Sequence, residues 1–159
     1  MLLPTNEQLL TQLKDQRIST RLIRDIRYTP QSITDEEFRD FLAVTTKSGN
    51  EGVLLYAGAV VPFSLMRKGA NAQGRAEAII CDICATWQRG SNAARITFAS
   101  SASTTHSFLV CADLNCSLHV RDKTPESKLS RTQLRENISP EARVARLHAR
   151  LTSILGHVQ

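Results

Sequence analysis

Aromatic side chains are scarce in this chain of 159 residues, where Phe, Tyr and Trp together account for 5%. The core must therefore be built mainly from Leu, Ile, Val and Ala, and a bound metal could supply order that a small core lacks. Long apolar runs are also missing, since no stretch approaches the roughly eighteen apolar residues that span a membrane. We therefore expect a soluble globular protein, for which a hydrophobic content of 42% is ordinary.

Signals for export and for catalysis are absent as well. Residues 1–7 contain no basic region, no apolar segment of adequate length and no cleavage site, so we expect a cytoplasmic protein. The chain has no glycine-rich phosphate loop, no paired-carboxylate site and no dinucleotide fingerprint. The hydroxyl-rich residues 100–105 have no adjacent base to activate them. We therefore expect a binding protein, with no catalytic residues, rather than an enzyme.

Cysteine is rare too, and its placement is informative. The four cysteines form two close pairs, Cys81 with Cys84 and Cys111 with Cys116. Cysteines separated by two or four residues can turn both sulfurs toward one ion, and tetrahedral Zn²⁺ accepts four thiolates. We therefore predict a Zn²⁺ site formed by these four residues, structural rather than catalytic because four thiolates leave no open position.

Other roles for the cysteines account for the sequence less well. Disulfides need an oxidising compartment, and a thioredoxin-like motif would leave Cys111 and Cys116 unexplained. A redox-labile zinc cluster, in which oxidation releases the metal, stays open. His119 lies three residues after Cys116 and could ligate the ion, but four thiolates favour a place for it beside the ligands or at the surface.

The first part of the chain is predicted to begin with helices. The spacing of Leu and Ile indicates one helix or two short helices over residues 6–28. Thr34 and Glu37 have the spacing of a capping box, which predicts a further helix whose buried side includes Phe41.

Strands and a domain boundary are predicted next. Residues 52–63 are rich in Val, Leu and Ala and predict one or two strands, although Pro62 argues against a central position in a sheet. Residues 66–74 indicate a flexible connector or the tip of a hairpin. We place the domain boundary there, which divides the chain into a helical and mixed α/β segment, residues 1–74, and a zinc-binding domain, residues 75–159.

Beyond the boundary, the predicted elements follow the order of a treble-clef zinc finger. A strand at residues 76–80 leads to the first cysteine pair, a β-hairpin within residues 95–110 leads to the second, and Cys116 begins a helix. Ser139 then caps a long amphipathic helix that ends near Gly156. The sequence therefore predicts an α+β fold, in which a treble-clef Cys₄ zinc finger with a β-hairpin follows a helical and mixed segment and is closed by a C-terminal amphipathic helix.

The formal net charge is +5, and the excess lies after the last cysteine. Residues 117–159 contain eight Lys or Arg against four Asp or Glu, whereas residues 1–74 contain nine against eight. This asymmetry favours an anionic partner such as RNA, a ribosomal surface or an acidic protein face. We predict that the partner contacts seven basic residues: Arg89, Arg95, Arg121, Lys123, Arg143, Arg146 and Arg150.

The single tryptophan and an N-terminal group of arginines are two further candidates for binding. Trp87 is the only tryptophan and could be an interface anchor, but we expect it in the core. The second half of the predicted N-terminal helical region carries a basic face, which we interpret as solvated because most such faces are: Arg17, Arg21, Arg24 and Arg27.

Two segments resemble a known family. Residues 110–121, around the second cysteine pair, resemble the second zinc knuckle of the elongation factor G-binding proteins, the FusB-type fusidic-acid resistance proteins. Residues 138–147 resemble the closing helix of that family, and the resemblance covers residues 75–155. It implies a treble-clef domain whose four cysteines hold Zn²⁺, and which binds elongation factor G and promotes its release from the ribosome. In some members this confers resistance to fusidic acid.

Two alternative functions stay open. An RNA-binding zinc protein would account for the C-terminal arginines and would bind RNA with a steep dependence on salt. A thiol-based redox regulator would release zinc under mild oxidation. In none of these functions do we expect a membrane or a small-molecule substrate as the partner.

Overall fold

The computed structural model describes residues 3–33, 35–69, 77–100, 103–125 and 137–158. Its helices are α1 (Asn6–Asp15), α2 (Thr20–Asp25), α3 (Cys116–His119) and α4 (Pro140–Gly156), with 3₁₀ turns at Pro30–Ser32, Glu36–Phe38 and Gly90–Asn92. Its strands are β1 (Leu42–Thr45), β2 (Glu51–Tyr56), β3 (Ala59–Arg67), β4 (Ile79–Ile80), β5 (Trp87–Gln88), β6 (Ala93–Ala99) and β7 (Thr105–Cys111). Among the helices of the described ranges, none has the length and apolar character needed to cross a membrane.

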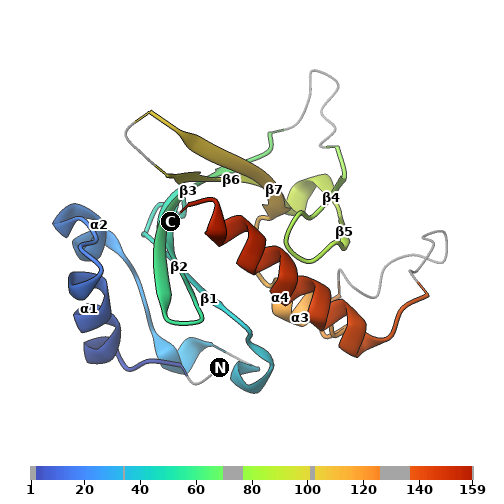
Figure 1. Cartoon of the computed structure of the whole chain (residues 1–159), viewed down its shortest axis with the longest axis horizontal. Helices are drawn as coiled ribbons and strands as arrows, with labels where there is room; N and C mark the ends of the chain where they lie inside the picture. The colour runs from blue at the N-terminus through green and yellow to red at the C-terminus, as the bar shows by residue number, and fades with distance from the viewer. Residues whose placement is uncertain (1–2, 34, 70–76, 101–102, 126–136, 159) are drawn as a thin grey trace.

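An antiparallel sheet in the order β1-β2-β3-β6-β7 forms the centre of the described chain, and β4 pairs with β5 in a separate ribbon (Figure 1). β3 pairs with β6 from Ser64 opposite Thr97 to Arg67 opposite Ala94, so the sheet includes strands from both sides of the predicted boundary. The division into residues 1–74 and 75–159 as separate folding units stays a prediction.

Helices cover both faces of β2, as Figure 1 shows with α1 and α2 on one side of the strand and α4 on the other. Val53 and Leu55 point to one face and pack in a cluster with Leu9 and Leu13 of α1. Leu54 points to the opposite face and belongs to the larger cluster that contains α4 and the four cysteines. Because both faces are buried, β2 has an almost continuous apolar sequence rather than an alternating one.

The ends of the helices follow capping rules. Thr5 and Gln8 form a reciprocal capping box at α1, with Thr5 Oγ1 accepting from Gln8 N at 3.2 Å and Gln8 Oε1 accepting from Thr5 N at 2.8 Å. Ser139 caps α4 through a hydrogen bond from Ala142 N at 3.2 Å, with Pro140 at the first helical position. The predicted N-terminal and C-terminal helices are therefore confirmed, the former as two short helices.

The helix predicted around residues 34–42 is wrong. Thr34 lies outside the described residues, and after it the chain makes only a 3₁₀ turn at Glu36–Phe38 before β1 begins. Phe41 packs in the cluster on the α4 side, whereas Leu42 packs in the cluster on the α1 side. Neighbouring residues that point to opposite sides have the alternation of a strand, so tertiary packing overrides the local capping signal.

Pro62 lies in β3, which is the middle strand of the sheet, so the objection to a central position is also wrong. The pairing explains how the proline is tolerated. Pro62 is opposite Val53 of β2, but β3 pairs with β6 only from Ser64 onward. At Pro62 the strand therefore has a neighbour on one side only, which is the edge-like environment that proline requires.

Candidate metal centre

The first cysteine pair lies in a tight knuckle directly after β4. Ala85 N donates to Cys81 O at 2.8 Å and Cys81 N donates to Thr86 O at 2.9 Å, which brings the chain back on itself. Ala85 adopts a positive φ of 56°, which this reversal requires. Asp82 fixes the knuckle to β7, because its backbone N donates to Leu109 O at 2.7 Å and its carboxylate accepts from Leu109 N at 2.6 Å.

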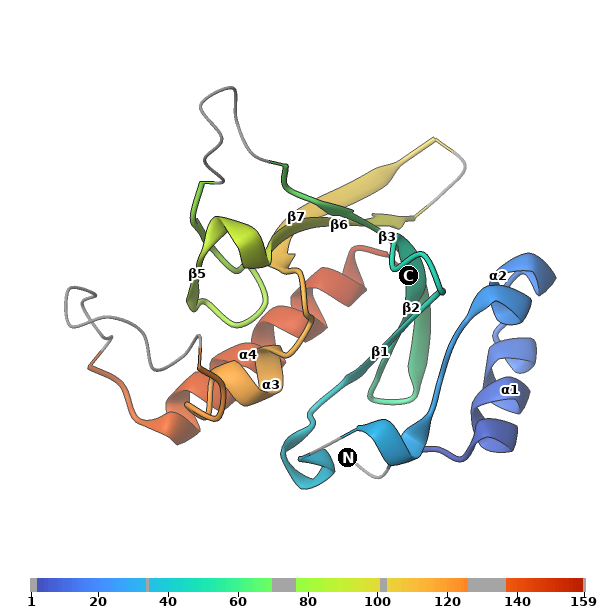
Figure 2. The ribbon, with the colours of Figure 1, turned by 180° about the vertical axis from the view of Figure 1, so that it is seen from behind.

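The second pair joins the end of β7 to the start of α3. Cys111 is the last residue of β7, and Leu114 N donates to Cys111 O at 3.1 Å with Leu114 at a φ of 53°. Cys116 is the first residue of α3. The predicted order is therefore confirmed: a knuckle, an antiparallel hairpin made by β6 and β7, and a helix that begins with a cysteine. Figure 2 shows α3 and the β5 segment beside α4.

The four sulfurs converge on one point. The Sγ–Sγ distances are 3.5 Å from Cys84 to Cys111, 3.7 Å from Cys81 to Cys116 and 3.8 Å from Cys111 to Cys116, and all four sulfurs lie within 4.8 Å of one another. Zinc–sulfur bonds of about 2.3 Å in a tetrahedron require sulfurs about 3.8 Å apart. The arrangement therefore fits a single metal ion, and all four thiols are free rather than paired in disulfides.

The thiols are buried, with at most 1% of each cysteine exposed. Hydrogen bonding to the nearby sulfurs of Cys111, Cys81 and Cys84, followed by burial and by repulsion from a second negative sulfur, raises the pKa of Cys116 well above its usual range. A divalent cation removes this penalty and holds all four as thiolates. Four thiolate ligands would leave no open position on a tetrahedral ion, which is the coordination of a structural site.

A buried polar network surrounds the sulfurs. Thr86 Oγ1 lies 2.8 Å from Cys84 Sγ and accepts from Gln88 Nε2 at 2.8 Å. Gln88 and His119 are both completely buried, and the Nδ1 of His119 lies 3.2 Å from Cys111 Sγ. Hydrogen bonds to ligand sulfurs orient the ligands and spread their charge. His119 therefore lies beside the ligands, one of the two places that the sequence favoured for it.

Asp113 faces the other nitrogen of His119, with Nε2 and Oδ2 3.3 Å apart. Burial lowers the pKa of His119, but Asp113 and Cys84 outweigh burial and raise it to about 9. The nearby carboxylate therefore favours the charged form of the ring, whose Nδ1 also lies 3.0 Å from Gln88 Nε2. Residue spacing alone did not identify Thr86, Gln88 or Asp113, because strand pairing and the α3 turn bring them together.

α4 contributes one arginine to the first knuckle. Arg150 Nη1 donates to Asp82 O at 3.0 Å and approaches Cys81 O at 3.5 Å. The guanidinium thus gives Asp82 O a donor and adds a second, longer contact to Cys81 O, which already accepts from Ala85 N. The same helix buries Leu147 and Leu151 in the cluster that contains the cysteines. α4 is therefore part of the metal-centre scaffold.

The seven basic residues predicted to contact a partner have different environments. Arg89 and Arg95 are exposed, and Lys123 is exposed with its Nζ 3.8 Å from the centroid of the Phe38 ring. Arg121 and Arg143 form two-pronged ion pairs with Asp40 and Asp122, respectively, and Arg146 and Arg150 are half-buried on α4. Their role as partner contacts stays a prediction.

Trp87 is not in the core, so that expectation is wrong. It is 39% exposed, and its cross-strand partner in the β4–β5 ribbon, Ile80, is 65% exposed. Gln88, the next residue, points the other way and is buried beside His119. Alternation along β5 therefore places the polar residue inside and the aromatic residue outside, because the interior of this ribbon holds the polar network around the sulfurs.

Comparison with known proteins identifies one relationship. The profile of the family described as the FBP C-terminal treble-clef zinc-finger matches residues 31–158. The matched range contains both cysteine pairs, the whole antiparallel sheet and α4. No curated protein and no solved structure matches the chain. The family match, the hairpin and the clustered cysteines confirm the predicted α+β treble-clef fold.

Proposed function

The chain belongs to the FBP C-terminal treble-clef zinc-finger family, and from this premise we propose that it is a non-enzymatic, zinc-stabilised module that binds translation elongation factor G. The family match over residues 31–158 is the observation that carries the proposal. Binding in the cytoplasm would promote release of the factor from the ribosome and thereby give tolerance to fusidic acid.

In this proposal Cys81, Cys84, Cys111 and Cys116 hold Zn²⁺, which when bound links the two knuckles and supplies no reaction chemistry. The protein's own residues then form the contact surface. The β4–β5 ribbon directly flanks the first knuckle, since β4 ends at Ile80 and β5 begins at Trp87. Ordering of the knuckle therefore also orders the ribbon.

We assign the factor-binding surface to Ile80, Trp87 and Arg89, here called the ribbon face. Ile80 and Trp87 are directly paired and both exposed. Arg89 directly follows β5 in an extended backbone conformation, with φ −61° and ψ 150°, and it is exposed. Tryptophan and arginine are the residue types that most often dominate binding energy at protein interfaces. A rigid ribbon that exposes both types supports a role in protein binding.

The test is a binding titration with purified elongation factor G and the zinc-loaded protein. Trp87→Ala should weaken binding by about tenfold or more, because loss of an interface anchor costs about 2 kcal/mol. Leu10→Ala is the matched control, since Leu10 is an apolar residue of similar exposure, 42%, on α1. Absence of binding by the zinc-loaded wild-type protein would refute the proposed function. Equal losses in both variants would refute the ribbon face.

A further inference from the structure

In the structure, exposed positive charge is found in a different part of the chain from the one that the sequence indicates. The sequence places the charge excess after Cys116, but Arg121 and Arg143 of that segment are half-buried and paired with carboxylates. The basic face of residues 17–27, interpreted from sequence as merely solvated, contains exposed arginines instead. Two of them, Arg21 and Arg27, line a cleft with a lysine from a different element.

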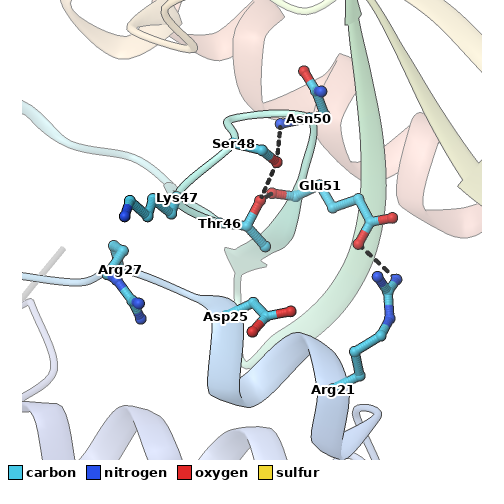
Figure 3. A pocket seen from close by; sticks show the side chains of 8 residues that line it. All are labelled: Arg21, Asp25, Arg27, Thr46, Lys47, Ser48, Asn50 and Glu51. Carbon is cyan, nitrogen blue, oxygen red and sulfur yellow. Dashed lines mark hydrogen bonds and ion pairs between the residues drawn. The ribbon is translucent and has the colours of Figure 1, made fainter.

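This cleft lies between α2 and the turn that joins β1 to β2, and has a volume of about 660 Å³. Figure 3 shows its side chains, which come from α2, the segment after it, the β1–β2 turn and the first residue of β2. All of the lining residues are polar or charged: Arg21, Asp25, Arg27, Thr46, Lys47, Ser48, Asn50 and Glu51.

Backbone hydrogen bonds hold the two walls of the cleft together. Arg27 N donates to Thr45 O at 3.0 Å, and Lys47 N donates to Asp25 O at 3.2 Å. Thr46 and Ile26 form an antiparallel bridge between these bonds. The position of Arg27 relative to Lys47 is therefore set by main-chain pairing, so the cleft is preorganised rather than assembled from flexible side chains.

The two carboxylates that line the cleft are paired with arginines. Two further cationic side chains of the cleft, Arg27 and Lys47, have a different environment. Glu51 pairs with Arg21 at 2.7 Å, and Asp25 pairs with Arg24 at 3.3 Å. Arg27 Nη1 instead donates to the main-chain oxygens of Arg24 and Ile26, at 3.3 and 3.2 Å, which orients its guanidinium without neutralising the charge. Within the part of the chain that the structure describes, neither Arg27 nor Lys47 forms an ion pair. The cleft is thus cationic at these two side chains.

From this arrangement we propose that the cleft binds the phosphodiester backbone of a nucleic acid through Arg27 and Lys47. Protein interfaces have a fully buried apolar core, and no lining residue here could supply one. Nucleic-acid interfaces are polar and positively charged, and arginine, lysine, serine and asparagine are typical donors to phosphate oxygens. That the nucleic acid is RNA rests on the proposed function, because a module that acts at the ribosome meets RNA there.

The test measures binding of a fluorescein-labelled oligouridylate to the zinc-loaded full chain by fluorescence anisotropy at several salt concentrations. Each phosphate contact to a single strand contributes about 0.7 to the log–log salt dependence. Replacing both cations by Arg27→Gln and Lys47→Gln should weaken binding and reduce the slope by about 1.4. An unchanged slope, or no binding by the wild-type protein at low salt, would overturn the proposal.

Two controls separate this surface from the factor-binding surface. Arg89→Gln should leave the RNA slope unchanged while weakening binding to elongation factor G, and the double variant should do the reverse. Failure of the factor titration alone therefore counts against the proposed function, and failure of the RNA titration alone counts against the cleft. A DNA oligonucleotide of matching sequence distinguishes RNA from nucleic acid in general. Binding of poly-glutamate at least as tightly as RNA would identify an acidic protein as the partner and overturn the assignment.

Discussion

Cys84 is the residue for which substitution should have the largest effect. It contacts both Cys111 and Thr86 through its sulfur, and folding energy linked to a structural zinc is on the order of 10 kcal/mol. Cys84→Ser should therefore remove most bound zinc and abolish cooperative unfolding of residues 75–159. Chromogenic zinc release and circular-dichroism melting measure the two effects.

The His119→Gln variant tests whether His119 is itself a zinc ligand or only contacts one of the four cysteine ligands. His119 faces the sulfur of Cys111 but is additional to four thiolates. The variant should keep stoichiometric zinc with an affinity about 10–100-fold lower, because a lost hydrogen bond to a ligand weakens the site without opening it. Wild-type zinc affinity in Cys84→Ser, or complete zinc loss in His119→Gln alone, would contradict the four-thiol site.

At the level of single residues, the sequence identified the four thiols but not which charges are exposed. The cysteines could be found because close spacing along the chain is itself the signal of a shared ion. Arg121 could not be placed in this way, since its carboxylate partner Asp40 lies 81 positions earlier. Trp87 and Gln88 were equally ambiguous, because only the polar network tells which of them points inward.

Gly52 of β2 shows how closely the strands of this sheet approach. A Cβ atom at this position would lie 2.3 Å from Val44 O and 2.8 Å from Phe63 Cζ, and the carbonyl oxygen cannot move without disturbing β1. Gly52→Ala should therefore destabilise the protein by about 1–3 kcal/mol, in the range of overpacked cores. Urea unfolding measures the change. Gly69→Ala is the matched control, because nothing lies within 4 Å of its Cβ position, and a comparable loss there would contradict the steric explanation.

Elements with a strong local signal were predicted, and elements defined by distant partners were not. α4 has a capping serine, a proline at its first position and a regular apolar seam, so its start was predicted correctly. β1 carries a local helix signal just before it, and its strand conformation comes from pairing with β2. The position of Pro62 depends on where β6 stops along β3, which a single sequence does not contain.

Residues 39 and 40, which lead into β1, contact α3, the turn after it and α4. Arg39 Nη1 donates to Asn115 Oδ1 at 2.7 Å, and Asp40 N donates to Ser117 Oγ at 3.0 Å, so this segment contacts the start of α3. The Asp40 carboxylate also accepts from Arg121 at 2.5 and 2.9 Å and lies 3.1 Å from His148 Nε2 on α4. Through its carboxylate and its backbone N, Asp40 therefore joins the N-terminal half to the α3 segment and to the closing helix.

This junction predicts a specific dependence of stability on pH. Burial raises the pKa of Asp40, but Arg121, His148 and Ser117 outweigh it and hold the pKa below its usual value. A carboxyl group with a lowered folded-state pKa stabilises the fold above its unfolded pKa, about 3.9, and this contribution is lost as the pH falls through the folded-state value. Asp40→Asn should therefore lower the free energy of unfolding at pH 7 by about 1–3 kcal/mol, because Arg121 loses its charged partner.

The two proteins should begin to converge in stability as the pH falls below about 4, and should meet only below the lowered folded-state pKa of Asp40, where the wild-type side chain is protonated and neutral like asparagine. Urea unfolding at a series of pH values gives the difference directly. Asp25→Asn is the control, because Asp25 belongs to an ion pair whose side chains are 76% and 44% exposed, and such pairs contribute little. A difference between wild type and Asp40→Asn that persists unchanged at low pH would mean that the asparagine acts through packing, and that the charge of Asp40 does not hold the three parts together.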